Sequence, residues 1–282
     1  MLAASLLFIL SLLGLIGAVN ALRGPATHRK PQYRPPWLPV LLTAEAVPIR
    51  VALHGVLAAL LIWAGALDRL AGRIGLVLTI LTWVGYVAIQ WRAASTREVM
   101  AAALQDVGID PDGFAHVDWR RVLAVYPYRI PKSIIRIEDI EYAPGLHLDI
   151  YRRSDLENRP HPTLLYVHGG SWRGGNRRQQ GRPLLHRLAE QGWIAVSASY
   201  PLAPTATFPD QLVALKRALA WLREEGTAYS VDPSFIAISG GSAGGHLAAL
   251  AALTANRPEF QPGFEDQDTA VQAAVPVYGI YD

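Results

Sequence analysis

The stretch from Phe235 to Leu250 constrains the fold of this chain most strongly, because its character changes abruptly at a cluster of glycines. Before the cluster the chain is apolar and rich in residues that favour strands, and after it the chain is rich in Ala and Leu, which favour helices. A single serine stands at the junction, in the pattern Gly240-x-Ser242-x-Gly244. This pattern predicts a strand, a sharp turn and a helix, with the serine hydroxyl raised above the sheet edge.

Glycine is expected on both sides of Ser242, because a Cβ at Gly240 or Gly244 would collide with the neighbouring strand or helix in so tight a turn. The helix that follows directs its first N–H groups toward the same point, so the amide of Ala243 can stabilise a developing oxyanion. The five-residue pattern alone is not specific, since Gly, Ser and Ala are common. The flanking strand and helix, together with a second motif upstream, strengthen the interpretation of Ser242 as a nucleophile.

The second motif is His168-Gly169-Gly170, which ends the apolar run Thr163 to Val167. That run suits a buried strand, and open α/β sheets place their chemistry at the C-terminal ends of such strands. Two consecutive glycines let backbone amides turn toward a substrate oxygen. Gly169, Gly170 and Ala243 are therefore the candidate donors of an oxyanion hole, each of which stabilises a transition state by about 3 to 4 kcal/mol.

The chain from residue 131 onward alternates strand and helix patterns, which predicts an α/β fold with a mainly parallel sheet covered by helices on both faces. The predicted strands are residues 135–142 and 147–152, which form a hairpin, then 163–167, 193–200, 235–239 and 271–277. The predicted helices are residues 183–190, 210–225 and the helix after Ser242, which extends to Ala255. Residues 95–130 are predicted to form a helical connector or a lid.

The first 94 residues carry most of the apolar excess of a chain that is 51% hydrophobic. Three stretches, near residues 2–20, 51–67 and 74–91, are long and apolar enough to predict an all-α region of about three membrane spans. The segment that flanks the first stretch holds four Lys or Arg residues, Arg23, Arg29, Lys30 and Arg34, and the loop after the second stretch holds two, Arg69 and Arg73. The positive-inside tendency then predicts a multi-pass protein of the cell membrane with residues beyond 92 in the cytoplasm.

Charge and cysteine content narrow the function classes. Residues 1–94 hold eight basic and two acidic residues, while the remainder holds 18 basic and 21 acidic. The basic excess therefore belongs to the membrane flanks and gives no support for nucleic-acid binding. The absence of cysteine excludes disulfides, thiolate metal sites and a cysteine nucleophile. No metal and no cofactor are predicted, and the oligomeric state cannot be read from the sequence.

A set of motifs in fixed order carries a family resemblance. The motifs are His168-Gly169-Gly170-Ser171-Trp172, Tyr200-Pro201-Leu202-Ala203-Pro204, Phe208-Pro209, Asp232-Pro233 and Gly240-Gly241-Ser242-Ala243-Gly244-Gly245. Across residues 134–282 the chain resembles the α/β-hydrolase fold in its hormone-sensitive-lipase-like branch of carboxylesterases. The apolar N-terminus resembles that of the membrane-anchored esterases of actinobacteria.

This resemblance implies a serine carboxylesterase that acts on short- or medium-chain acyl esters. Ser242 would attack the ester carbonyl, the amides of Gly169, Gly170 and Ala243 would hold the oxyanion, and water would hydrolyse the acyl-enzyme. Ser171 departs from the family pattern, in which many relatives have a third glycine, so its amide is less free to turn inward. The motif also resembles arylformamidases of the kynurenine formamidase type and feruloyl or acetyl esterases. A third alternative is a catalytically silent, membrane-tethered binding module.

The resemblance also implies a general base and an acid, which follow the serine in the order acid, then histidine. Nothing after Ser242 fits these roles: His246 lies four residues along the same helix, where we expect it to pack, and Asp282 directly follows a strand. Fewer strands are present than the fold requires. The expectation is therefore that the hydrolase sheet is incomplete at its C-terminus and that the acid and the histidine lie beyond residue 282.

Overall fold

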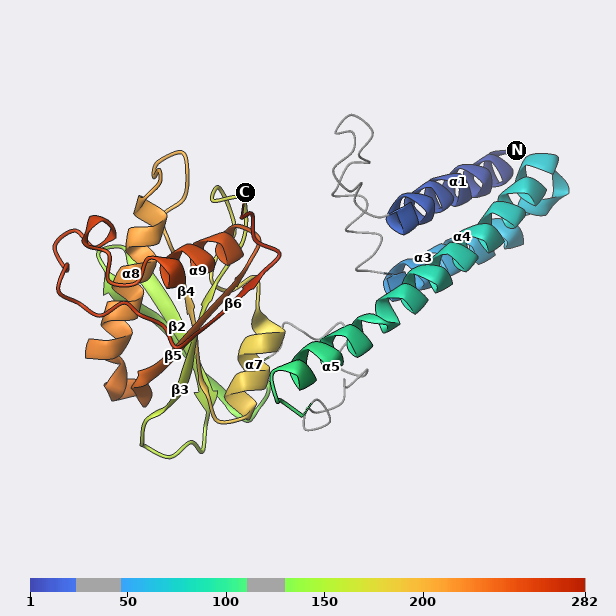
Figure 1. Ribbon diagram of the computed structural model, residues 1–282. Coiled ribbons are helices and arrows are strands. Elements are labelled where there is room, and N and C mark those ends of the chain that lie inside the picture. Colours follow the sequence, from blue (N-terminus) through green and yellow to red (C-terminus); the bar gives the residue numbers. More distant parts are fainter. Residues whose placement is uncertain (24–46, 111–129, 282) are drawn as a thin grey trace. The chain divides into compact units, whose positions relative to one another are not determined.

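The computed structural model describes residues 1–23, 47–110 and 130–281 (Figure 1). The chain divides into two compact units, Met1–His116 and Val117–Asp282. The predicted connector, residues 95–130, contributes one described helix to the first unit. Its remaining part, residues 111–129, lies outside the described residues.

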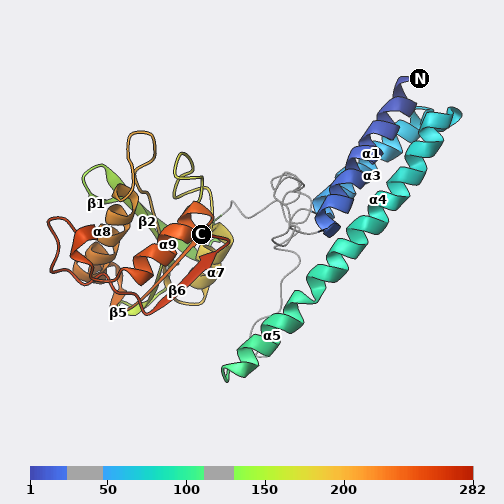
Figure 2. The same cartoon turned by 45° about the horizontal axis from the view of Figure 1, so that its top comes forward.

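The first unit consists of α-helices in each of the three apolar stretches (Figures 1 and 2). These helices are α1 (Leu2–Arg23), α3 (Val47–Trp63) and α4 (Leu70–Ala94), and α5 (Thr96–Asp106) follows α4. A turn at Gly65, whose φ of 81° suits glycine, leads into a short 3-10 helix (Ala66–Asp68) between α3 and α4. Helices α1, α3 and α4 pack against one another.

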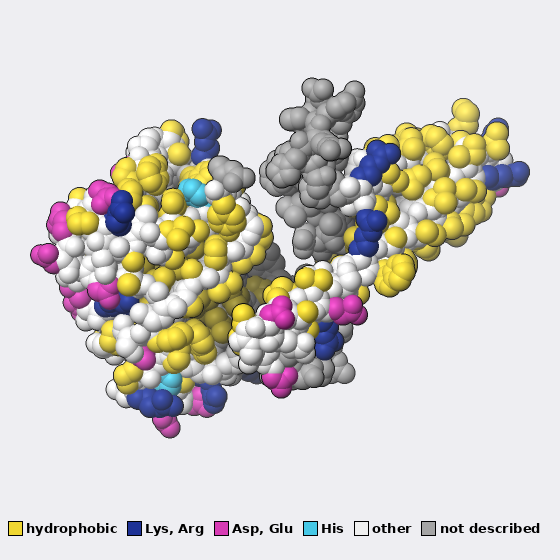
Figure 3. Space-filling model, viewed as in Figure 1, with side chains coloured by type: hydrophobic (Ala, Val, Ile, Leu, Met, Phe, Trp, Pro, Cys, Tyr) yellow, Lys and Arg dark blue, Asp and Glu magenta, His cyan; other side chains and the backbone are white. Residues whose placement is uncertain are grey.

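In this unit many large apolar side chains face outward, whereas in a water-soluble helical bundle they face the interior. The interior of this unit includes small and polar residues beside buried Leu7 and Tyr86. Ser11 and Thr79 hydrogen-bond across α1 and α4 at 2.7 Å, and a Cβ on Gly75 would lie 2.9 Å from the backbone N of Phe8. Large apolar side chains instead face outward, as the hydrophobic surface of these helices shows (Figure 3). Small residues at helix contacts and apolar residues outside are typical of helices in lipid.

Two helical stretches, Leu2–Arg23 and Leu70–Asp106, are long and apolar enough to cross a membrane, judged by length and composition. Helix α3, with 17 residues, is shorter. The prediction of about three spans is therefore not confirmed, although helices form in all three predicted stretches.

The second unit is built on a six-stranded sheet in the order β1-β2-β4-β3-β5-β6. Its strands are β1 (Ile134–Ala143), β2 (Leu146–Arg153), β3 (His161–Val167), β4 (Ile194–Ala198), β5 (Val231–Gly241) and β6 (Ala273–Val277). Its α-helices are α7 (Arg182–Glu190), α8 (Asp210–Glu224) and α9 (Ala243–Leu253). Short 3-10 helices lie at Gly226–Tyr229 and Pro258–Phe260.

Alternating side chains on the central strands serve two separate cores. On β3, Leu165 and Val167 pack with α8 and α9, while Tyr166 packs with Leu185 of α7 on the other face. The predicted alternation of strands and helices thus produces a sheet covered on both faces. The described residues confirm the predicted hairpin, which β1 and β2 form as an antiparallel pair.

The sheet is mainly parallel, as predicted, and it is mixed because one strand, β2, runs against the others. β2 pairs antiparallel with both β1 and β4, whereas β4, β3, β5 and β6 run parallel. The hairpin is responsible, since only one of its two strands can run parallel to the rest of the sheet.

The strand order also fixes where two loops meet. The chain moves from β3 to β4 on one side and then crosses back to β5 on the other side, which makes β3 and β5 neighbours at a topological switch point. Their parallel register pairs Val167, which precedes the first glycine-rich motif, with Gly240, the first residue of the second. Loops far apart in the sequence therefore leave the sheet side by side.

Candidate active site

Ser242 occupies the sharp turn between β5 and α9. Its φ of 55° and ψ of −121° lie in a region that side chains other than glycine rarely adopt. The main chain is pinned on both sides, because the Ser242 N–H donates to Val277 O at 3.0 Å and the His246 N–H donates to Ser242 O at 3.0 Å. The hydroxyl is half-buried and has no hydrogen-bond partner among residues 1–23, 47–110 and 130–281. The main-chain hydrogen bonds therefore fix the backbone of Ser242, while its hydroxyl makes no hydrogen bond to a described residue.

The glycines around Ser242 are required by close approach of the backbone. A Cβ on Gly244 would lie 2.1 Å from Val167 O and 2.6 Å from His168 O. A Cβ on Gly240 would lie 2.6 Å from the same Val167 oxygen. The turn from Gly240 to Gly244, called the elbow below, therefore lies directly against the end of β3, as tightly as the pattern predicts.

The His168-Gly169-Gly170 loop meets Ser242 directly. A Cβ on Gly169 would lie 3.1 Å from the Cβ of Ser242 and 2.6 Å from Gly241 O. The structure thus brings together the predicted nucleophile and the predicted oxyanion loop, which are more than 70 residues apart in the sequence.

The three predicted oxyanion donors differ in whether their N–H groups are free. The Gly169 N–H donates to Gln180 Oε1 at 2.8 Å, so in this structure it is engaged by the protein. The N–H groups of Gly170 and Ala243 make no hydrogen bond to any described residue. The same holds for Ser171, whose φ of 53° shows that it adopts a left-handed conformation although it is not glycine.

His168 supports the oxyanion loop through ring stacking and hydrogen bonds. Its ring is buried, stacks on Tyr200 at 4.4 Å between centroids, and has Nδ1 2.9 Å from Gly169 O. The Tyr200 hydroxyl donates to His168 O at 2.8 Å, and burial raises the pKa of Tyr200 to about 12. Burial also lowers the pKa of His168, so its ring is neutral near pH 7. These contacts make His168 a structural support for the loop.

A buried ion-pair cluster anchors the segment that carries Gln180. Asp149 on β2 is fully buried and accepts hydrogen bonds from Arg177 Nε at 3.0 Å and Arg178 Nε at 2.6 Å. Burial alone would raise the pKa of Asp149, but bonds from Arg178, the Asp139 amide and Arg177 hold it below its ordinary value. The sequence did not reveal this cluster, because nothing in the local pattern links Asp149 with arginines 28 and 29 residues later.

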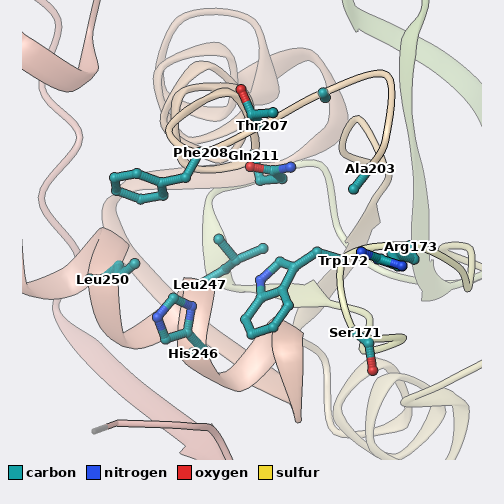
Figure 4. A pocket seen from close by; sticks show the side chains of 11 residues that line it. Ser171, Trp172, Arg173, Ala203, Thr207, Phe208, Gln211, His246, Leu247 and Leu250 are labelled. Carbon is teal, nitrogen blue, oxygen red and sulfur yellow. The ribbon is translucent and has the colours of Figure 1, made fainter.

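A cavity of about 610 Å³ opens beside the two loops (Figure 4). Trp172 from the oxyanion loop, Phe208 from the segment before α8, and Leu247 from α9 form apolar walls. His246 also lines the cavity, and its ring meets Trp172 edge-on at 5.3 Å between centroids. No histidine among the described residues hydrogen-bonds to Ser242 Oγ. The described residues also contain no group of three or more His, Asp or Glu side chains placed to hold a metal ion.

Sequence comparisons show that this chain is similar to known esterases. A family model described as BD-FAE matches residues 148–282. The chain is 45% identical over 206 residues to the probable carboxylic ester hydrolase LipM and 44% identical over 218 residues to the esterase LipQ, both of Mycobacterium tuberculosis. These matches cover 68% and 71% of this chain but 48% and 51% of the relatives. The chain therefore spans about half the length of the curated relatives it matches.

Similarity extends to more distant proteins over shorter stretches. Arylacetamide deacetylase of Oryctolagus cuniculus is 40% identical over 93 residues, which is 32% of this chain and 23% of that protein. Among solved structures, the esterase 2 of Thermogutta terrifontis phosphonylated by sarin superposes with a TM-score of 0.46 at 26% identity. That match covers 55% of this chain and 56% of the other.

Proposed function

We propose that this chain, which belongs to the hormone-sensitive-lipase-like branch of the α/β-hydrolase carboxylesterases, is a membrane-anchored serine esterase with Ser242 as its nucleophile. One observation carries the proposal: a hydroxyl without a hydrogen-bond partner in the described part of the chain stands on a strained turn, and the Cβ of that serine lies 3.1 Å from the Cβ position of Gly169. Free backbone amides on both sides of such a hydroxyl fit acyl transfer.

In this mechanism a general base takes the Ser242 hydroxyl proton while the Ser242 oxygen attacks the carbonyl carbon of a short- or medium-chain acyl ester, and the same proton then passes to the oxygen of the leaving alcohol. The carbonyl oxygen becomes negatively charged and accepts hydrogen bonds from the free amides of Gly170 and Ala243. Collapse of the tetrahedral intermediate expels the alcohol and leaves an acyl-enzyme, which water then hydrolyses. Gly169 contributes through the shape of the loop, because Gln180 already engages its amide.

The first unit is proposed to anchor the protein in the cell membrane as a multi-pass region. Its outward-facing Leu, Ile and Val side chains would contact lipid, and interfacial Trp63 and Trp91, both exposed, would lie near the headgroups. The first loop is more basic than the second, which supports an orientation with the hydrolase unit in the cytoplasm.

Substitution of the serine tests the function. The full-length protein is assayed with p-nitrophenyl butyrate and octanoate, and Ser242→Ala is expected to lower kcat by roughly 10³-fold or more. Ser234→Ala is the matched control, because this exposed serine lies on β5 and bonds only to Asp232. An N-formylated aromatic amide, assayed in parallel, distinguishes an esterase from an arylformamidase. Hydrolysis that survives in Ser242→Ala at the wild-type rate would refute the proposal.

A further inference from the structure

The cavity beside Ser242 has a composition that a plain hydrocarbon chain would not need. Most of its wall is apolar and comes from Trp172, Phe208, Leu247 and Leu250. Besides Ser171, Arg173 and Thr207, two further polar side chains line the cavity, Gln211 and His246. Figure 4 shows these two on opposite sides of the space, Gln211 above and His246 beside Trp172 below. A polar group inside an apolar cavity is costly unless it is paired, so each of the two requires an explanation.

Gln211 is buried and unpaired. Only 4% of the residue is exposed, yet its side-chain amide makes no hydrogen bond to any residue in the described ranges. Its position is fixed, because it stands in the first turn of α8, where the Asp210 carboxylate accepts a hydrogen bond from the Thr207 N–H at 3.0 Å. A rigid helix start thus holds an amide, which can both donate and accept, against the cavity.

His246 is the second unpaired group. Neither ring nitrogen has a partner among the described residues: Nδ1 is buried, and Nε2 is the nitrogen that remains accessible. The edge-on contact with Trp172 fixes the ring plane. Burial lowers the pKa of His246, so near pH 7 the ring is neutral, with one nitrogen able to donate and the other able to accept. Two uncharged polar groups therefore face the same space without protein partners.

The cavity is lined by residues that are close in sequence to the oxyanion loop and to Ser242. Ser171 and Trp172, which line it, directly follow Gly170 in the chain, and His246 lies one helical turn after Ser242. A group attached to the ester carbonyl or to its alcohol oxygen would extend into this space. A volume of about 610 Å³ is within the range of pockets that hold small organic ligands.

We propose that this cavity binds one arm of the ester substrate, and that this arm is apolar along its length but carries one uncharged hydrogen-bonding group, such as a ketone or a hydroxyl, that pairs with the side-chain amide of Gln211. The inference rests on the proposed esterase function and specifies its substrate class. A charged group is not expected there, because Arg173, the only cationic side chain among the described residues that line the cavity, is exposed to solvent.

Matched substrates test the inference in the full-length protein. The first series compares p-nitrophenyl octanoate with octanoates that carry a ketone at carbon 5, 6 or 7. The second series compares butyrate esters of 1-octanol and 7-oxo-octan-1-ol, which place the same arm in the alcohol. In at least one series we expect kcat/KM of a ketone ester to exceed that of the plain ester by roughly 3- to 10-fold, the effect of one hydrogen bond.

Variants assign the preference to Gln211. Gln211→Leu is expected to bring the ketone-to-plain ratio of kcat/KM to about 1, since the plain chain loses nothing. Gln191→Leu is the matched control, because this exposed glutamine at the end of α7 is far from the cavity lining, and it should keep the wild-type ratio. A ratio near 1 in the wild type for both series, or an unchanged ratio in Gln211→Leu, would overturn the inference.

A binding measurement separates this inference from the esterase proposal. Unreactive amides of octanoic and oxo-octanoic acids, and N-octyl and N-(7-oxo-octyl) butanamides, are titrated by calorimetry. The keto ligand of one pair should bind several-fold tighter to the wild type and equally to Gln211→Leu. Inactivity toward every ester would count against the esterase function alone, whereas equal binding of both members of each pair to the wild type would count against the substrate class.

Discussion

Close backbone contacts at the elbow determine which residues can occupy positions 240 and 244. Val167 O lies within 2.6 Å of the Cβ positions of both Gly240 and Gly244, so one carbonyl oxygen limits two residues of the nucleophile motif. Ser242 itself keeps a positive φ, which costs free energy that the surrounding hydrogen bonds must offset. Function at this site therefore depends on Gly240 and Gly244, which fit because they have no side chain.

Gly244→Ala is expected to destabilise the hydrolase unit by about 1 to 3 kcal/mol or more, because the added methyl meets two backbone oxygens that cannot move independently. Thermal unfolding would report the loss, and esterase activity should fall with it. Gly174→Ala is the control, since a Cβ there has nothing within 4 Å. Equal stability of the two variants would contradict the packing described for the elbow.

Gln180 is predicted to position the oxyanion loop through its bond to the Gly169 amide. Gln180→Met removes the acceptor while keeping a side chain of similar length, and we expect kcat to fall by roughly 3- to 10-fold with little change in KM. Hydrogen exchange of the peptide that contains Gly169 should become faster. The neighbouring Gln179→Met should change neither quantity, because that side chain is exposed and has no hydrogen bond to a described residue. Unchanged exchange in Gln180→Met would refute the positioning role.

Local pattern predicted some of these residues and could not predict others. Ser242 and its glycines belong to one continuous motif, and the approach of Gly169 follows from the strand order. Gln180 and the Asp149 cluster have no signal in the sequence, because their contacts join segments separated by 11 to 29 residues whose packing only the fold determines. Gln211 has none either, because the cavity that it lines forms only in the folded chain.

At the scale of helices and strands, apolar periodicity predicted the elements of the hydrolase unit. The relative directions of its strands depend on how the strands pair in the sheet. The predicted helix at residues 210–225 corresponds to α8, Asp210–Glu224, whose buried Leu212, Leu215 and Leu219 face the sheet. Pattern alone could not show that β2 runs antiparallel to β4, since a buried strand looks the same in either direction.

Helix α8 also carries a buried cation that joins it to the loop after α9. Lys216 is fully buried, and its Nζ donates to Thr254 O and to Thr269 Oγ1, the latter at 3.1 Å. Burial lowers the pKa of Lys216 from 10.5 to about 8. Since the folded pKa lies below the unfolded value, the unfolded chain binds more protons between these values, and the free energy of unfolding rises with pH there.

We therefore expect the stability of the wild type to gain on the order of 2 kcal/mol between pH 8 and 10 relative to Lys216→Met, which has no proton to release. Chemical denaturation of both proteins across this range measures the difference. A stability difference between them that does not vary with pH would show that Lys216 titrates normally in the folded protein.

At the scale of the whole molecule, the two units have opposite surface chemistry. The first unit exposes apolar side chains and buries Ser11, Thr79 and Thr82, whereas the second buries its apolar residues around a sheet. Hydropathy predicted the location of the apolar helices but not which faces would be buried, because α1 and α4 are apolar on all sides.

The membrane proposal predicts that the intact chain, expressed in cells, remains in the membrane pellet after washing with alkaline carbonate. Because the chain has no cysteine, its orientation can be read from single substitutions. Thr27→Cys in the first loop should resist an impermeant maleimide in intact cells, and Arg69→Cys in the second should react. Release of the chain into the wash would refute the membrane location, and the reverse labelling pattern would reverse the orientation.

The most direct test of the account is covalent labelling of the nucleophile in the full-length protein with a p-nitrophenyl alkylphosphonate. We expect one equivalent of p-nitrophenol to be released, activity to be lost in parallel, and the added mass to map to the peptide that contains Ser242. Labelling of another residue, with Ser242 unmodified while activity is lost, would contradict the central claim that this serine forms the acyl-enzyme.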